Sequence, residues 1–173
     1  MKNTMIGVLL VLVAGFAFAN GQGEEPVDAM TNPTQSVIGG PGDVQPAMGP
    51  DGGWIVIFEE DIAVDSPITV SGEVYEEAGA EAPRRKIALY TQDSDRNVTA
   101  RFTLSVPELI VDHVNTRIQA GTIAGDVYVQ AEGFQLRGAT IDGDLYFASE
   151  ALQEAAEIDD ESTVTGNVAI GSM

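Results

Sequence analysis

The sequence predicts an all-β protein: a short single-stranded parallel β-helix (β-solenoid) of about six rungs behind a disordered N-terminal tether. Two observations lead to this prediction. From residue 51 onward, β-branched and aromatic residues alternate with polar ones in short runs bounded by Gly, Pro, Asn or Asp, which is typical of strands. The C-terminal half also carries an internal repeat. One such repeat cannot bury its apolar side alone, so copies are expected to stack.

The first segment, residues 1–19, has the pattern of a secretory signal peptide. Lys2 precedes an apolar run that ends in Ala17-Phe18-Ala19, the small-x-small pattern of a cleavage site. The run is about fifteen residues, shorter than the roughly 20 that span a bilayer as a helix. We therefore expect an exported protein, periplasmic, on the cell surface or secreted, with no integral membrane span after cleavage. A retained membrane anchor is the alternative.

The next segment, residues 20–50, is rich in Gly, Pro, Asn, Gln and acid, and we expect a disordered linker because it can bury little apolar surface. The domain is expected at residues 51–173, with irregular or capping rungs at 51–100 and regular repeats at 101–173. An irregular first half leaves an antiparallel β-sandwich as the alternative fold. Strands are expected at residues 54–58, 67–75, 85–92, 98–106 and 108–114, with a loop at 76–83 and Pro107 at a corner.

The repeat consists of TIAGDVYV (122–129), TIDGDLYF (140–147) and TVTGNVAI (163–170), and RIQAGT (117–122) aligns with QLRGAT (135–140). The first two copies are offset by 18 residues and the next by 23, with the extra residues in a short helical turn or bulging loop within 149–162. TVSGEVYE (69–76) is a weaker copy. Alternation points the aliphatic residues inward as columns and places Gly125, Gly143 and Gly166 at a corner.

Composition excludes several classes of function. The chain has 27 Asp plus Glu against 8 Lys plus Arg, a net charge of -19, no Cys and one His. Nucleic acid is not expected as a partner, because affinity for phosphates comes from Lys and Arg. Disulfides and thiol chemistry are excluded. The sequence contains no nucleophile motif that could act together with His113, so we do not expect an enzyme.

One slot of the repeat carries acidic residues. Asp126 and Asp144 occupy it, Asn167 follows in the third copy, and Glu73 falls there in the weaker copy; Asp142 lies nearby. Stacked carboxylates repel, and Ca²⁺ would relieve that repulsion through Asp126, Asp144 and Asp142. The alternative is that these are turn residues bonded to local backbone, with no cofactor. Calcium is the single cofactor hypothesis.

A second slot carries Tyr128 and Tyr146, with Tyr75 in the weaker copy. These rings are expected outside, as a stabilising ladder or as a surface for carbohydrate, such as a cell-wall or surface polysaccharide. Val168 and Ile170 in the last strand are the expected contacts for self-association.

Two further features concern single residues. Arg84-Arg85-Lys86 is the one basic cluster, which we interpret as a solvated turn, with docking to an acidic partner or anionic lipid as the alternative. Trp54 is expected in the core or as a cap over the first rung.

The repeat region, about residues 102–170, resembles the Gly-Asp-containing rungs of bactofilins, bacterial polymer-forming proteins with a β-helical core. The resemblance implies end-to-end self-assembly, whereas the signal peptide departs from that family. The expected function is an exported, non-catalytic structural or scaffolding protein of the cell envelope. The alternative is a module that binds calcium or carbohydrate, or an adhesin-like surface domain.

Overall fold

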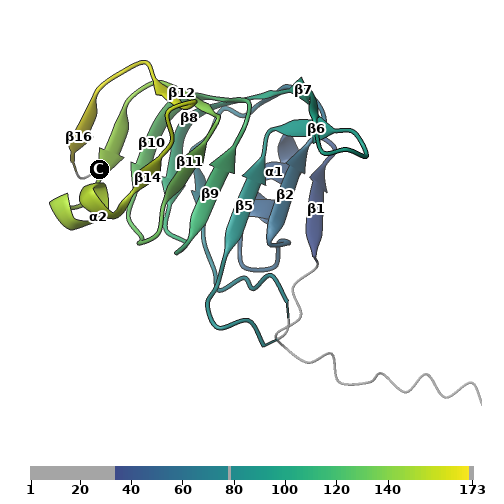
Figure 1. Cartoon of the computed structure of the whole chain (residues 1–173), viewed down its shortest axis with the longest axis horizontal. Helices are drawn as coiled ribbons and strands as arrows, with labels where there is room; N and C mark the ends of the chain where they lie inside the picture. Colours follow the sequence, from purple (N-terminus) through teal and green to yellow (C-terminus); the bar gives the residue numbers. More distant parts are fainter. Residues whose placement is uncertain (1–33, 78, 172–173) are drawn as a thin grey trace, which may run out of the picture.

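The computed structural model describes residues 34–77 and 79–171 and consists mainly of parallel β-sheet (Figure 1). The predicted signal peptide and linker residues 20–33 lie outside the described residues. The first sheet has six strands in the order β1-β2-β5-β9-β11-β14. Its strands are β1 (Gln35–Ile38), β2 (Ile55–Phe58), β5 (Arg85–Ala88), β9 (Thr116–Gln119), β11 (Gln135–Arg137) and β14 (Glu157–Ile158).

The second sheet has eight strands, and β8 and β10 at its centre are the longest. Its strands are β3 (Ile62–Ala63), β4 (Ile68–Val70), β8 (Thr103–Val111), β10 (Thr122–Val129), β12 (Thr140–Asp142), β13 (Leu145–Phe147), β15 (Thr163–Val164) and β16 (Val168–Ile170). Every pairing in the two sheets is parallel, which makes the antiparallel sandwich wrong.

The register confirms the repeat in the C-terminal half. Thr122 pairs with Thr140 and Thr140 with Thr163, as the alignment of the three copies requires. In the first sheet, Arg117 pairs with Gln135. The weaker copy at 69–76 is wrong: Thr69 pairs with Ile110, which in turn pairs with Tyr128. Two residues of 69–76 therefore occupy other slots than those the alignment gave them.

The core lies between the two sheets and consists of columns of aliphatic and aromatic residues. One column from the second sheet contains Leu109, Val127 and Leu145, all fully buried, and a neighbouring column contains Val129 and Phe147. Phe147 meets Phe134 edge to face at 6.2 Å between ring centroids. Burial of apolar surface at about 25 cal/mol per Å² is the main stabilising term here. The expected inward direction of these columns is confirmed.

The predicted disordered linker is wrong for residues 34–50, which form β1 and helix α1 (Pro41–Met48). Val44 and Met48 of α1 are fully buried against the N-terminal end of the core. The Gln45 side chain also pairs with β4: its amide donates to the Thr69 carbonyl at 3.1 Å and accepts from the Thr69 N–H at 2.9 Å. These tertiary contacts order a segment whose composition alone predicts disorder.

Pro107 lies inside β8 instead of at a corner between strands. The pairing of β8 with β10 shifts between Ala124 and Asp126, so the chain bulges where Pro107 has no N–H to donate. Opposite the bulge, Gly125 has φ 150°, and a Cβ there would lie 1.7 Å from the Val106 carbonyl oxygen. A Cβ on Gly143 would lie 2.4 Å from the Gly125 carbonyl oxygen. Backbone contact between successive repeats thus requires glycine at these positions.

Two insertions interrupt the stack. β6 (Tyr90–Gln92) and β7 (Val98–Arg101) form an antiparallel hairpin, so the predicted strands at 85–92 and 98–106 are each divided. Within 149–162, α2 (Glu150–Ala155) confirms the predicted helical turn, and its N-cap Ser149 accepts a hydrogen bond from the Leu152 N–H. Across residues 34–77 and 79–171, the helices are too short to cross a membrane.

Candidate functional site

Within residues 34–77 and 79–171, the apolar columns are uncovered at the C-terminal end of the two sheets. Ile158 continues the column of Leu136, Val168 that of Leu145, and Ile170 that of Phe147. The last members are 41%, 45% and 54% exposed, whereas their predecessors are fully buried. We call Ile158, Val164, Val168 and Ile170 the C-terminal apolar end. An uncovered edge of this kind presents both apolar side chains and unpaired strand backbone.

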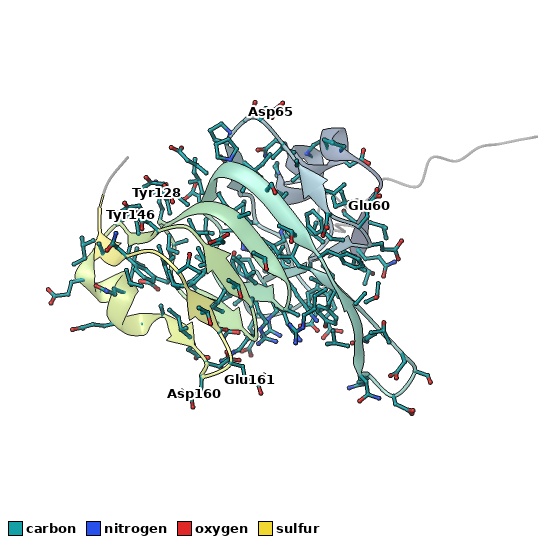
Figure 2. The ribbon with its side chains drawn as sticks, turned by 90° about the horizontal axis from the view of Figure 1, so that it is seen from above. Glu60, Asp65, Tyr128, Tyr146, Asp160 and Glu161 are labelled. Carbon is teal, nitrogen blue, oxygen red and sulfur yellow. The ribbon has the colours of Figure 1, made fainter. Side chains whose placement is uncertain are left out.

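Acidic residues surround the C-terminal apolar end. Residues 149–171 contain no Lys or Arg, and their acids are Glu150, Glu154, Glu157, Asp159, Asp160 and Glu161. Figure 2 shows Asp160 and Glu161 projecting from this part of the molecule. Asp159 is held in place, because its carboxylate accepts bonds from Ser162 Oγ at 2.6 Å and from the Gly138 N–H. These bonds lower the pKa of Asp159, so it is charged at neutral pH.

The N-terminal end is closed by α1 and by Arg85. The Arg85 guanidinium is fully buried and donates to the carbonyls of Ala47, Gly49 and Ser71. Cations near the last carbonyls of a helix are stabilising. Burial lowers the pKa of Arg85 to about 10, so it still carries its charge at neutral pH. The interpretation of 84–86 as a solvated turn is therefore wrong for Arg85.

The acidic slot holds neighbouring repeats together through hydrogen bonds. Asp126 Oδ1 accepts from the Asp144 N–H at 2.9 Å, and Asp144 Oδ1 accepts from the Asn167 N–H at 2.7 Å. Asp142 Oδ1 accepts from Thr165 Oγ1 at 2.9 Å. Glu73 does not share the slot, because Glu108 pairs with Asp126. Within the described residues no group of three His, Cys, Asp or Glu is arranged for a metal, and calcium stays a prediction.

Tyr128 and Tyr146 stack, with ring centroids 4.8 Å apart and an angle of 20° between planes (Figure 2). The Tyr146 hydroxyl donates to Asp144 Oδ2 at 2.7 Å, which raises the pKa of Tyr146 to about 12. Ile110, not Tyr75, precedes Tyr128 in the column, so the predicted third tyrosine is wrong. Both rings are half-buried, which fits a ladder that stabilises the sheet. Their role as a carbohydrate surface stays a prediction.

His113 uses both ring nitrogens in backbone contacts. The Val74 N–H donates to Nε2 at 3.2 Å, so Nδ1 carries the proton and donates to the Val114 carbonyl at 2.6 Å. The side chain is 1% exposed, and burial lowers its pKa. This histidine joins the 71–75 segment to the turn after β8.

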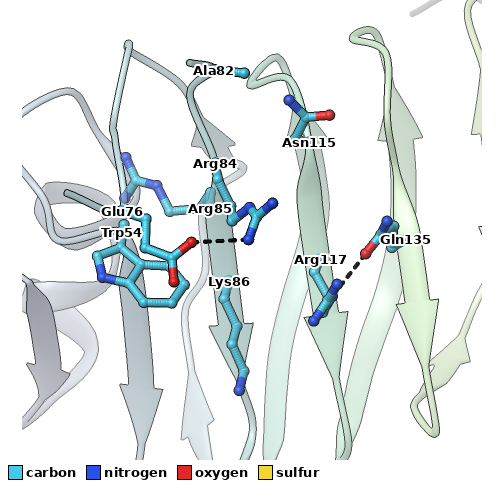
Figure 3. A pocket seen from close by; sticks show the side chains of 9 residues that line it. All are labelled: Trp54, Glu76, Ala82, Arg84, Arg85, Lys86, Asn115, Arg117 and Gln135. Carbon is cyan, nitrogen blue, oxygen red and sulfur yellow. Dashed lines mark hydrogen bonds and ion pairs between the residues drawn. The ribbon is translucent and has the colours of Figure 1, made fainter. Parts of the chain in front are cut away.

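A cationic pocket that sequence reasoning missed lies on the outer face of the first sheet, with a volume of about 440 Å³ (Figure 3). Its charge comes from Arg84, Lys86 and Arg117. The Arg84 guanidinium pairs with the Glu76 carboxylate at 2.9 Å. Lys86 and Arg117 are direct register partners on β5 and β9. The sequence signal for this pocket is that Lys86 and Arg117 occupy the same register position on neighbouring strands. The β6–β7 hairpin inserted between the two strands makes their spacing irregular and hides this signal.

Trp54 forms one wall of this cationic pocket instead of a cap or a core residue. It is half-buried and directly precedes β2. Figure 3 shows its indole beside Glu76, across the pocket from Arg117 and Gln135. The indole Nε1 is buried and has no hydrogen-bond partner among the described residues.

Comparisons with protein-family models, with curated proteins and with solved structures found no match. The resemblance to bactofilins therefore stays a prediction.

Proposed function

We propose that the chain forms a short β-solenoid of six rungs and serves as an exported, non-catalytic structural protein of the cell envelope. We propose further that two copies associate through the C-terminal apolar end. The observation that carries this proposal is the exposure of Ile158, Val168 and Ile170, because the preceding members of their columns, Leu136, Leu145 and Phe147, are fully buried.

The six rungs correspond to the six strands of the first sheet, one strand for each rung. Each is followed along the chain by α1 or by strands of the second sheet, with the β6–β7 hairpin inserted after β5, so the chain returns to the first sheet once per rung. The parallel register between successive rungs supports this interpretation. Structures of this kind depend on neighbour contacts, and their terminal rungs need cover.

A second copy is the occupant that matches the C-terminal apolar end best. It presents the same columns and the same unpaired edges, and a two-fold axis would bring β16 of each copy together as antiparallel strands. Helix α1 and Gln45 already cover the second-sheet edge at the other end. Association would therefore stop at pairs instead of continuing into the polymers that the bactofilin resemblance implies.

Charge sets the condition under which pairs form. The acids of residues 149–171 would meet the same acids of the second copy, and apart from Glu157, which pairs with Arg137, no ion pair offsets them within the described residues. Salt screens such repulsion, since the Debye length falls from about 10 Å at 0.1 M to about 3 Å at 1 M. Association is expected to strengthen with ionic strength.

Sedimentation velocity over a wide range of protein concentration tests the proposal, with low and high salt in parallel. We expect a monomer that converts to a dimer, with the midpoint at lower concentration in high salt. The double variant Val168→Asp, Ile170→Asp should remain monomeric. Val98→Asp is the matched control, because Val98 is 42% exposed on the β6–β7 hairpin, away from the C-terminal end. A monomer under all conditions contradicts the proposal.

A further inference from the structure

The positive charge of this acidic chain is concentrated in one place. Of 8 Lys and Arg residues, four lie on or beside the outer face of β5, β9 and β11: Arg84, Lys86, Arg117 and Arg137, of which Arg137 pairs with Glu157. The chain as a whole has 27 acidic residues. A local cluster of this kind creates a positive potential in an otherwise negative field, and a recess between the side chains focuses it.

Part of this charge is not neutralised by the protein. Lys86 and Arg117 are directly opposite each other in the register, and like charges in that position are destabilising. Lys86 Nζ donates to the Tyr90 hydroxyl at 2.8 Å and Arg117 Nε to Gln135 Oε1 at 2.8 Å, both neutral acceptors. Among residues 34–77 and 79–171, no carboxylate lies within 4.0 Å of either cation. An anion bound between them would relieve the repulsion.

The rest of the cationic pocket suits an organic ring that carries hydroxyl groups. The Trp54 indole supplies an aromatic wall, and the amides of Asn115 and Gln135 can donate to and accept from hydroxyls. A volume of about 440 Å³ exceeds what an inorganic anion needs and falls within the usual range of ligand pockets. A guanidinium such as that of Arg117 recognises a carboxylate with two parallel hydrogen bonds.

We propose that this pocket binds an acidic saccharide, with the sugar ring against Trp54 and its carboxylate between Lys86 and Arg117. The net charge of -19 repels long, densely charged polyanions, so short or sparsely charged chains are preferred. The site lies on the outer face of the first sheet, apart from the C-terminal apolar end, and does not depend on the proposed self-association.

Trp54 is the single tryptophan of the chain and lines the pocket, so its fluorescence reports on this site directly. The probe is tri-galacturonate, with maltotriose as the neutral match and inorganic phosphate as the bare anion. We expect a saturable change with tri-galacturonate that weakens at high salt, and no saturation with maltotriose or phosphate at the same concentrations. Arg117→Gln should weaken binding about tenfold, as expected for loss of a charge-assisted bond.

Two further variants separate a binding role from a folding role. Lys86→Gln removes the second cation and should weaken binding as well, with the melting temperature of each variant measured in parallel. Arg96→Gln removes the same charge from the turn between β6 and β7 and should leave binding unchanged. The proposal is overturned by equal binding of maltotriose or phosphate, by unchanged binding in both pocket variants, or by no saturation with tri-galacturonate.

Discussion

The two ends of the stacked sheets carry the same kind of apolar columns but are finished differently. At the N-terminal end, α1 places Val44 and Met48 over the core, Gln45 pairs with the backbone of Thr69, and Arg85 holds the end of the helix. At the C-terminal end, Ile158, Val168 and Ile170 stay exposed. Leu152 of α2 packs against the core at the C-terminal end but leaves these three side chains exposed, so within the described residues only α1, at the N-terminal end, covers the last members of the columns.

The largest expected effect is a difference in the loss of stability between substitutions at two members of one column. Phe147 is fully buried, and Ile170, its register partner in the next strand, is 54% exposed. Phe147→Ala should lower the free energy of unfolding by about 3–5 kcal/mol, and Ile170→Ala by less than about 1 kcal/mol at concentrations where the chain is monomeric. Urea denaturation measures both. Equal losses would mean that the end is already covered.

The next largest effect is expected when Arg85, which bonds to the last carbonyls of α1, is replaced. Arg85→Met leaves the carbonyls of Ala47 and Gly49 without their donor, and we expect a loss of about 3 kcal/mol, because each buried acceptor left without a donor costs about 1–3 kcal/mol. Arg84→Met is the matched control: Arg84 forms an exposed ion pair with Glu76, which contributes less than about 1 kcal/mol. Similar losses for the two variants would show that Arg85 does not hold the helix.

A smaller effect is expected from the glycines at which neighbouring repeats approach each other. In Gly143→Ala the new Cβ would lie 2.4 Å from the Gly125 carbonyl oxygen, and backbone must move, at a cost of about 1–3 kcal/mol. Gly42→Ala in α1 meets nothing within 4 Å and should be neutral or slightly stabilising. Thermal unfolding of both variants compares the tightness of packing in the repeat with that in helix α1. A neutral Gly143→Ala would contradict this packing.

The smallest expected effect is a dependence of stability on pH that comes from His113. Burial of His113 lowers its folded-state pKa below the ordinary 6.5; the hydrogen bond with the Val114 carbonyl opposes this, Arg85 lowers the pKa further, and Asp112 raises it slightly. The unfolded state therefore binds more protons between the two pKa values, so the stability from neutral His113 is complete above pH 6.5 and is lost as pH falls through that window. Denaturation between pH 7.5 and 5 should show the loss, and His113→Gln should reduce it. An equal pH dependence in the variant would assign the loss elsewhere.

Prediction from sequence succeeded where the chain repeats itself. The slots of Thr122, Thr140 and Thr163 follow from aligning three copies, and the structure pairs them in that register. The insertion before the third copy was also identifiable, because its Ala- and Glu-rich composition favours the helix found at Glu150–Ala155.

The remaining features depend on contacts between segments far apart in sequence. Helix α1 contains Pro46 and is ordered by Arg85, which lies 38 residues from Ala47, so local propensity does not predict it. The cationic pocket brings Lys86 next to Arg117 only because the β6–β7 hairpin leaves the stack between them. An irregular spacing hides such a pair from any search for repeats.

Pulsed electron spin resonance tests most directly the claim that two copies meet at their C-terminal ends. The chain has no Cys, so a single spin label can be attached at Asp160→Cys near the C-terminal apolar end, or at Gly42→Cys on α1. In high salt at high concentration, we predict a defined, short distance between copies for the label at 160 and no short distance for the label at 42. Absence of a distance at 160, or a short one at 42, would contradict the account.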